Sequence, residues 1–183
     1  ILLNGPTGSG KTTAIYSALC HLIDTHGPTI SISTVEDPVE FNLPMITQSQ
    51  ISNSRGFTYP MALRSLMRQD PEAIMIGEIR DPETAAIAVQ AGLTGHMVIS
   101  TIHSDSTAGV YARLINMNIE PFLLASSITG VLGLRLLRTI CPRCKTKDQP
   151  KPEHLTLLPE GFAEEMVFYT GAGCDSCSQT GYH

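Results

Sequence analysis

The stretch GPTGSGKTT at residues 5–13 constrains the fold of this chain more than any other feature. It satisfies the pattern G-x-x-x-x-G-K-[ST], in which the glycines allow backbone N–H groups to turn inward and form an anion-binding nest. The apolar segment ILLN before it predicts a strand, and TTAIYSALCHLI after it has helical spacing. Because phosphate binds where such a loop meets a helix N-terminus, we interpret the stretch as a nucleotide phosphate site rather than a glycine turn that binds nothing.

The residues of this loop have separate expected roles. Lys11 supplies a positive charge for the β- and γ-phosphates, and the Thr12 hydroxyl suits Mg²⁺, a hard cation that takes oxygen ligands. ATP and Mg²⁺ are therefore the expected ligands. The residues expected to contact nucleotide are Gly5, Pro6, Thr7, Gly8, Ser9, Gly10, Lys11, Thr12 and Thr13.

Strand-like and helix-like stretches alternate along most of the chain. Strands are expected at 29–36, 45–52, 73–79 and 96–102, and helices at 58–69, 81–95, near 106–116 and, longer, near 121–138. This alternation predicts an α/β fold with a mostly parallel sheet flanked by helices. The last part is rich in Pro, Lys and Cys with weak periodicity, so we divide the chain into a core over 1–139 and a small subdomain over 140–183.

Composition excludes several classes of protein. A hydrophobic content of 42% and a charged content of 16% indicate a globular chain, and no apolar run approaches the roughly 18 residues of a membrane span. The net charge of −5 and the absence of Trp disfavour a nucleic-acid partner. The chain starts inside a predicted strand and stops soon after a cysteine pair, so we expect a fragment of a longer protein.

Two acidic stretches follow predicted strands. In EDPVE, Glu36, Asp37 and Glu40 lie where ligands bind in open α/β sheets, although Asp37 followed by Pro also starts turns, and the residues alone leave both interpretations open. In AIMIGEIRD, an apolar strand ends in an acid, as in the Walker B pattern. Gly77 stands where that pattern usually has Asp, so Glu78 is the candidate to polarise water and the EDPVE acids become candidate substitutes.

Histidines and arginines complete the set of candidates. His96 opens one predicted strand and His103 ends it, and a regular strand would place them on opposite faces, so we favour His103. Arg64 and Arg68 share a helix face and form either a solvated pair or an edge that reaches a neighbouring subunit's γ-phosphate. Arg80 could pair with phosphate or with the adjacent Asp81.

Four of the five cysteines form two C-x-x-C pairs. Beside a phosphate loop, which works where ATP is, such pairs favour a metal over disulfides, although two disulfides or four free thiols stay possible. A tetrathiolate Zn²⁺ site would fold a subdomain whose few apolar residues, such as Leu155, Leu157 and Phe168, cannot hold it alone. Cys20 lies in the first predicted helix and is expected to be a small buried hydrophobe. The expected zinc ligands are Cys141, Cys144, Cys174 and Cys177.

Four stretches together resemble the secretion ATPase family, whose members drive type II secretion and type IV pilus assembly. They are GPTGSGKTT, TVEDPVE (the family's Asp box), LMRQDPEAIMIGEIRDPETAAIAVQAGLTGH (its Walker B region) and GHMVISTIH (its His box). The resemblance covers most of the chain and is far more specific than the phosphate loop alone. It implies a RecA-like ATPase core that works as a homo-hexameric ring, with Mg²⁺-dependent ATP hydrolysis at subunit interfaces.

The resemblance also implies partners, location and residue roles. Hydrolysis would move an inner-membrane platform protein that assembles pilins or pseudopilins. The motor would sit in the bacterial cytoplasm, held peripherally at the inner membrane by a recruitment partner, with no nucleic acid. By resemblance, the catalytic site comprises Glu36, Glu40, Glu78, His96 and His103, with Arg64, Arg68 and Arg80 as charge partners.

The four cysteines indicate which branch of the family this chain resembles. Assembly-type members carry a tetracysteine zinc motif after the His box, whereas retraction-type members lack it. The chain departs from the family's usual sequence in GLRLLR at 133–138, where Leu134 replaces a Gln that is common in the family. Two other functions stay open: a nucleic-acid translocase on the same core, which the acidic balance disfavours, and a zinc-bearing module with an inactive nucleotide fold, which the intact Lys11 and Glu78 disfavour.

Overall fold

The computed structural model describes residues 1–149, 152–156 and 166–183. The chain forms two compact units, Ile1–Arg135 and Leu136–His183. Thr139 and His183 donate backbone N–H groups to each other's carbonyl oxygens, both at 2.9 Å. This pairing joins Thr139 to the second unit.

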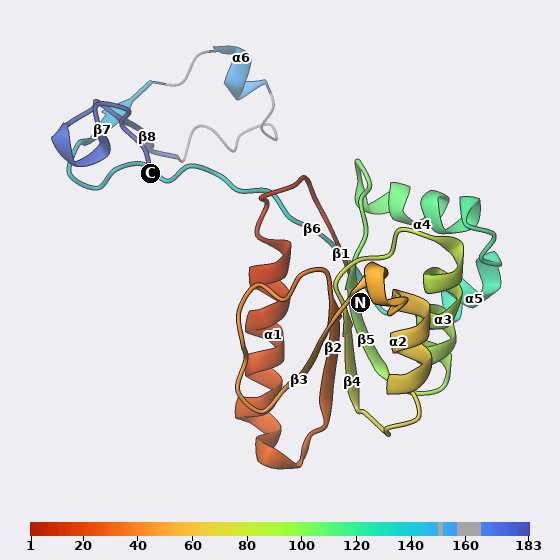
Figure 1. Cartoon of the computed structure of the whole chain (residues 1–183). Coiled ribbons are helices and arrows are strands. Elements are labelled where there is room, and N and C mark those ends of the chain that lie inside the picture. The colour runs from red at the N-terminus through yellow and green to blue at the C-terminus, as the bar shows by residue number, and fades with distance from the viewer. Residues whose placement is uncertain (150–151, 157–165) are drawn as a thin grey trace. The chain divides into compact units, whose positions relative to one another are not determined.

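A six-stranded sheet of parallel strands in the order β3-β2-β4-β5-β1-β6 forms the centre of the first unit (Figure 1). The strands are β1 (Leu2–Asn4), β2 (Ile32–Glu36), β3 (Thr47–Gln50), β4 (Ala73–Ile76), β5 (Met97–Thr101) and β6 (Val131–Gly133). The parallel sheet confirms the predicted α/β fold, and it brings the carboxyl ends of all six strands to one edge.

Helices cover both faces of this sheet, with α1 on one face and the other helices on the opposite face (Figure 1). They are α1 (Lys11–His26), α2 (Tyr59–Leu66), α3 (Pro82–Leu93), α4 (Thr107–Asn116) and α5 (Pro121–Ser127). The alternation of side chains along β4 builds both cores, because Ala73 and Met75 pack toward α1 whereas Ile74 and Ile76 pack toward the other helices. Among the described residues, no helix combines the length and apolarity needed to cross a membrane.

The long helix expected near 121–138 is wrong. Helix α5 ends at Ser127, and the chain then forms β6, which pairs in parallel with β1. The Leu2 N–H donates to the Gly130 carbonyl at 3.0 Å, so the backbone here is committed to the sheet. By its sequence alone, a short apolar segment fits either a helix or a buried strand. Residues 131–133 form a strand because the edge of β1 offers them backbone hydrogen-bond partners.

Helix α2 ends at Leu66, earlier than the expected helix over 58–69. The N–H of Arg68 donates to the Ser65 carbonyl at 3.2 Å in the turn that follows. Arg64 lies within the helix and Arg68 lies beyond it, so the expectation that both share one helix is wrong.

The described residues of the second unit form little apolar core. A two-stranded antiparallel sheet joins β7 (Lys145–Asp148) to β8 (Phe168–Gly171), with the short helix α6 (Pro152–Leu155) between them in sequence. Of the apolar residues expected to support it, Leu155 and Phe168 are half-buried, and Leu157 lies outside the described residues. The buried residues among those described here are Cys141, Cys177 and Gly181. The cysteines therefore occupy the position that an apolar core would normally fill.

Candidate active site and cysteine cluster

The phosphate loop follows β1 in a tightly constrained path. A Cβ added to Gly5 would lie 2.5 Å from the Leu134 carbonyl oxygen and 2.6 Å from Ser9 Oγ. Gly10 has φ of 86°, in the left-handed region that favours glycine. The buried Ser9 Oγ has no hydrogen-bond partner among the described residues. The loop therefore keeps the geometry of a phosphate nest and an unused polar atom inside it.

The start of α1 adds donors to this nest. Helix α1 begins at Lys11 and has no side-chain cap, whereas α3 is capped by the Asp81 carboxylate. Among the described residues, no side chain caps the first N–H groups of α1, as in helices that bind anions at this end. Lys11 Nζ donates to the carbonyl oxygens of Gly5 and Pro6, both at 2.9 Å. Burial lowers the pKa of the Lys11 ammonium, and the nearby Glu78 partly opposes this effect.

A cavity of about 160 Å³ lies beside the loop. It is lined by the start of α1 and by the segments that follow β2, β4 and β5. The cavity brings together six residues predicted from the sequence: Lys11, Thr12, Glu36, Glu40, Glu78 and His103. Residues far apart in sequence thus meet at the carboxyl edge of the parallel sheet, where α/β folds bind ligands.

Polar side chains fix the strand ends that carry these residues. Thr101 Oγ1 donates to the Gly77 carbonyl at 2.7 Å, which ties β5 to the turn that carries Glu78. Asn4 Nδ2 donates to the Ser104 carbonyl at 3.2 Å, which holds the segment just after His103 against β1. These bonds set the positions of Glu78 and His103 relative to the phosphate loop.

Gly77 explains why this site has no Asp in the Walker B position. A Cβ at Gly77 would lie 2.8 Å from the Tyr59 hydroxyl and 3.3 Å from both the Glu36 Cα and the Val35 carbonyl oxygen. Tyr59, from α2, lines the cavity and was missed by sequence reasoning. Burial and the nearby Glu78 carboxylate raise the pKa of Tyr59, so its hydroxyl stays protonated. The space that an aspartate would need is taken by this phenol.

Glu36 is buried and fully engaged by the protein. Its carboxylate accepts hydrogen bonds from the hydroxyls of Tyr16 and Thr34 and from Gln48 Nε2, the last at 3.1 Å. Tyr16 was also missed by sequence reasoning. The available signal was a tyrosine on the apolar face of a helix, because a buried phenol needs a partner for its hydroxyl.

The cavity carries an excess of negative charge. Its carboxylates are Glu36, Asp37, Glu40 and Glu78. Among its described lining residues, the only ammonium or guanidinium is that of Lys11. Carboxylate oxygens together with the Thr12 hydroxyl form the donor set that Mg²⁺ prefers, so these residues fit a hard divalent cation.

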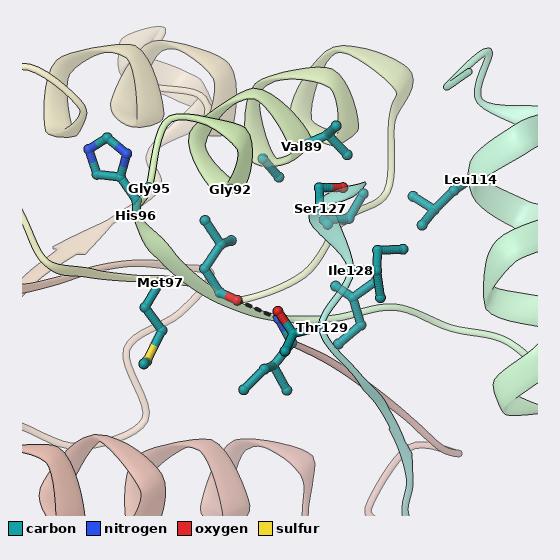
Figure 2. Close-up of a pocket in the computed structure, with 14 residues that line it drawn as sticks. Val89, Gly92, Gly95, His96, Met97, Leu114, Ser127, Ile128 and Thr129 are labelled. Carbon is teal, nitrogen blue, oxygen red and sulfur yellow. Dashed lines mark hydrogen bonds between the residues drawn. The ribbon is translucent and has the colours of Figure 1, made fainter. Parts of the chain in front are cut away.

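His96 lies in a different place. It lines a largely apolar cavity of about 260 Å³ together with Gly92, Ser127 and Ile128, as Figure 2 shows. Its Nδ1 lies 3.1 Å from the Ala91 carbonyl oxygen and 3.1 Å from Thr94 Oγ1, at the end of α3. His96 and His103 thus flank opposite ends of β5, and of the two only His103 lines the cavity beside the phosphate loop.

The three candidate arginines have different surroundings. Arg64 pairs with Glu83 at 2.6 Å, and both side chains are exposed. Arg80 pairs with Glu78, so of the three it is the one that contacts a residue of the cavity. Arg68 is exposed in the turn after α2. Neither Arg64 nor Arg68 lines the phosphate-loop cavity within this subunit.

In the second unit, four thiols converge. All four sulfur atoms lie within 4.8 Å of one another, and the Sγ–Sγ distances are 3.9 Å for Cys141–Cys174, 3.8 Å for Cys144–Cys177 and 3.8 Å for Cys174–Cys177. Sulfur atoms placed about 2.3 Å from a central zinc in a tetrahedron are about 3.8 Å apart, whereas a disulfide bond is about 2.05 Å long. The spacing fits a tetrathiolate metal site and does not fit disulfides.

Backbone donors favour a thiolate in this cluster. The N–H groups of Cys174 and Gly181 point to Cys177 Sγ at 3.3 Å and 3.2 Å. Burial raises the pKa of the Cys177 thiol, but these hydrogen bonds outweigh it and lower the pKa to about 6. Burial raises the pKa of the Cys144 thiol to about 12. A bound cation would stabilise the thiolates that the protein alone leaves protonated.

The sequence is similar to known proteins along its whole length. The family model for type II/IV secretion system proteins matches residues 1–183. A Vibrio cholerae protein named type II secretion system ATPase E is 46% identical, over 100% of this chain and 36% of that protein. A Myxococcus xanthus protein named type IV pilus assembly ATPase PilB is 47% identical, over 100% of this chain and 32% of that protein. The chain thus spans about a third of the length of these relatives.

Solved structures share the fold. The Legionella pneumophila ATPase DotB is 29% identical with a TM-score of 0.62, covering 77% of this chain and 40% of that one. The pilus retraction motor PilT with bound ADP is 27% identical with a TM-score of 0.58, covering 92% of this chain and 45% of that one. These similarities confirm the predicted RecA-like core.

Proposed function

The chain belongs to the type II/IV secretion system protein family, and from this premise we propose that it is the ATP-hydrolysing part of a motor for type II secretion or type IV pilus assembly. One observation carries the proposal. Lys11, Glu78 and His103, which come from three separate segments, line a single cavity at the carboxyl edge of the sheet. A nucleotide whose phosphates occupy the loop would place its reacting end in that cavity.

Each residue has a role that its geometry supports. Lys11 and the first N–H groups of α1 bind the β- and γ-phosphates and compensate their charge. Glu78, partly shielded and next to Lys11, orients the attacking water and accepts its proton. His103 lines the same cavity and holds the γ-phosphate end. Mg²⁺ bound by Thr12 and the neighbouring acids would neutralise charge on the phosphates.

We propose the remaining features from family membership. The whole protein would work as a homo-hexamer in which Arg64 and Arg68, exposed and outside their own cavity, serve the site of a neighbouring subunit. It would act in the bacterial cytoplasm, peripherally at the inner membrane, on a platform protein and through a recruitment partner. The net charge of −5 supports a protein partner over nucleic acid.

The four cysteines of the second unit favour a motor of the assembly type over one of the retraction type. We propose that Cys141, Cys144, Cys174 and Cys177 bind one Zn²⁺, because their spacing matches a closed tetrahedral site. Four thiolates leave no open position for a substrate, so this metal would be structural. It would fold a unit whose described residues build almost no apolar core.

The test of this function compares ATP turnover by the full-length wild-type protein with turnover by its Lys11→Ala variant. We expect Mg²⁺-dependent hydrolysis that Lys11→Ala abolishes, with weaker binding of a fluorescent ATP analogue. Addition of single-stranded DNA tests the alternative function, and it should leave the rate of ATP hydrolysis unchanged. Equal turnover by wild type and Lys11→Ala would exclude this loop as the active site, and strong stimulation by DNA would favour a nucleic-acid translocase.

A further inference from the structure

Tyr16 joins the helix of the phosphate loop to the acidic segment after β2. Tyr16 lies five residues after Lys11 on α1 and is 2% exposed. Its hydroxyl donates to Glu36 Oε2 and accepts the backbone N–H of Glu40 at 3.4 Å. Its ring meets the Phe41 ring edge-on, with centroids 4.7 Å apart. A single side chain of α1 therefore contacts both ends of the EDPVE stretch.

Two side chains of β3 also hold this segment. Gln50 Oε1 accepts the N–H of Val39 at 3.2 Å, and Gln48 Oε1 accepts the N–H of Leu43 at 2.6 Å. Gln48 Nε2 also donates to the Phe41 carbonyl at 3.3 Å. We call residues 37–43 the acidic loop. Three side chains outside the acidic loop thus hold its backbone, and of these only Tyr16 belongs to the helix that begins in the phosphate loop.

The same contacts separate the roles of the two glutamates. Glu36 is buried and its two oxygens already accept three hydrogen bonds from protein donors. Glu40 has an exposed side chain that lines the nucleotide cavity. Because a carboxylate that meets a hydrated cation needs free lone pairs, Glu40 is suited to that contact and Glu36 is suited to support it.

The Tyr16 hydroxyl stays a donor under all ordinary conditions. Burial, together with the hydrogen bond to Glu36, raises its pKa to about 12. The hydroxyl therefore keeps the proton that it donates to Glu36 near neutral pH. Removing the hydroxyl would leave a buried carboxylate oxygen without a donor and would release the Glu40 backbone.

We propose that Tyr16 is a positioning residue of the nucleotide site: through Glu36 and the backbone of Glu40 it fixes the acidic loop relative to the phosphate loop, so that Glu40 meets the cation and its waters. This inference rests on the proposed ATPase function. It assigns Glu36 to support and Glu40 to ligand contact. It predicts that loss of one hydroxyl that does not itself line the cavity disturbs the chemical step more than nucleotide binding.

The test uses Tyr16→Phe in the full-length protein, with Tyr111→Phe as the matched control because Tyr111 is partly exposed on α4 and lies outside the cavity. We expect kcat to fall about tenfold or more in Tyr16→Phe, the usual size when a partner of a ligating group is lost. The KM for ATP should change much less, and the Mg²⁺ concentration for half-maximal rate should rise. Tyr111→Phe should leave all three unchanged.

Hydrogen exchange supplies a readout that does not need turnover. Backbone amides of the acidic loop should exchange faster in Tyr16→Phe than in wild type, whereas those of the β4–β5 pair should not. Unchanged exchange in the loop would overturn the inference even if the whole protein proved to have no ATPase activity. Lack of ATP turnover in wild type, together with faster hydrogen exchange of the acidic loop in Tyr16→Phe, would reject the proposed function. It would leave Tyr16 as a residue that holds the acidic loop in place.

A double-mutant cycle separates positioning from general destabilisation. If Tyr16 acts through Glu40, Tyr16→Phe should lower kcat far less in a Glu40→Gln background than in wild type. A merely structural defect would lower kcat by the same factor in both backgrounds, together with the unfolding temperature. That additive result would overturn the assignment.

Discussion

The guanidinium of Arg80 donates a hydrogen bond to the carboxylate of Glu78, two residues earlier on the same segment. The Glu78 side chain is 17% exposed and the Arg80 side chain 64% exposed, so the arginine reaches the carboxylate from the solvent side. This bond raises the pKa of Arg80. Because the guanidinium occupies a carboxylate oxygen, we expect Arg80 to compete for Glu78 with the attacking water of the proposed reaction.

Glu78→Gln should stop hydrolysis while leaving ATP binding largely intact. The substitution keeps the shape of the side chain and removes the negative charge that polarises water, a role commonly worth about 10² to 10⁴ in rate. Single-turnover hydrolysis and binding of a fluorescent ATP analogue measure the two effects separately. Near-normal turnover in this variant would move the role to Glu40.

Restoring the usual Walker B aspartate should damage the site. In Gly77→Asp the new side chain would meet the Tyr59 hydroxyl and the backbone at Val35 and Glu36. Overpacking of this kind typically costs about 1–3 kcal/mol in the free energy of unfolding. Gly130→Ala is the matched control, because a Cβ there meets nothing within 4 Å. Chemical denaturation should show a loss only in the first variant, and equal stability of the two would contradict the assigned packing.

The two histidines should respond differently to the same substitution. His103→Asn should lower kcat, because His103 lines the nucleotide cavity beside Lys11 and Glu78. His96→Asn should act mainly on the unfolding temperature, since His96 Nδ1 contacts the Ala91 carbonyl and the Thr94 hydroxyl at the other end of β5. Steady-state kinetics measures kcat, and thermal unfolding measures the unfolding temperature, for both variants. A larger loss of kcat in His96→Asn would show that the distant cavity controls turnover.

One Zn²⁺ per chain should copurify with the protein in the absence of added metal. Removing it should unfold the second unit, because metal binding can contribute roughly 10 kcal/mol or more to the folding of such small units. Metal analysis together with thiol counting before and after chelation measures this. Zinc well below one per chain, with every thiol reactive before chelation, would leave the cluster without a metal.

A single cysteine variant extends this test. Cys174→Ser should lose the metal and the structure of the second unit, yet keep nucleotide binding at the phosphate loop. Cys20→Ser is the control, because Cys20 packs partly buried on α1 in the first unit. Loss of zinc from the Cys20 variant would contradict the assigned ligand set.

The sequence predicted the parts of this molecule that depend on local patterns. The phosphate loop and the acids that end strands follow from residue type and spacing, and the structure places them at one edge of the sheet. The region after Ser127 could not be predicted this way, because its strand exists only through pairing with β1. Local spacing carries no information about a free strand edge elsewhere.

The site residues that escaped prediction share one property. Tyr59 lines the nucleotide cavity from α2, and Tyr16, from α1, contacts two glutamates that line it. Neither tyrosine belongs to a sequence motif. Their roles arise from where helices pack against strand ends, which depends on the assembled fold. Gly77 differs from the two tyrosines, because the sequence shows that the usual Asp is missing at this position. The Tyr59 hydroxyl, which occupies the space that an Asp would need, is found only in the structure.

The mutual pairing of Thr139 with His183, next to the bridge between Ile140 and Tyr182, closes the stretch that carries the four cysteines into a loop. A metal bound by the four thiols would close the same loop a second time, at points inside it. Because a cross-link that closes a long loop restricts the unfolded chain strongly, the backbone pairing and the metal would stabilise the same length of chain in two independent ways.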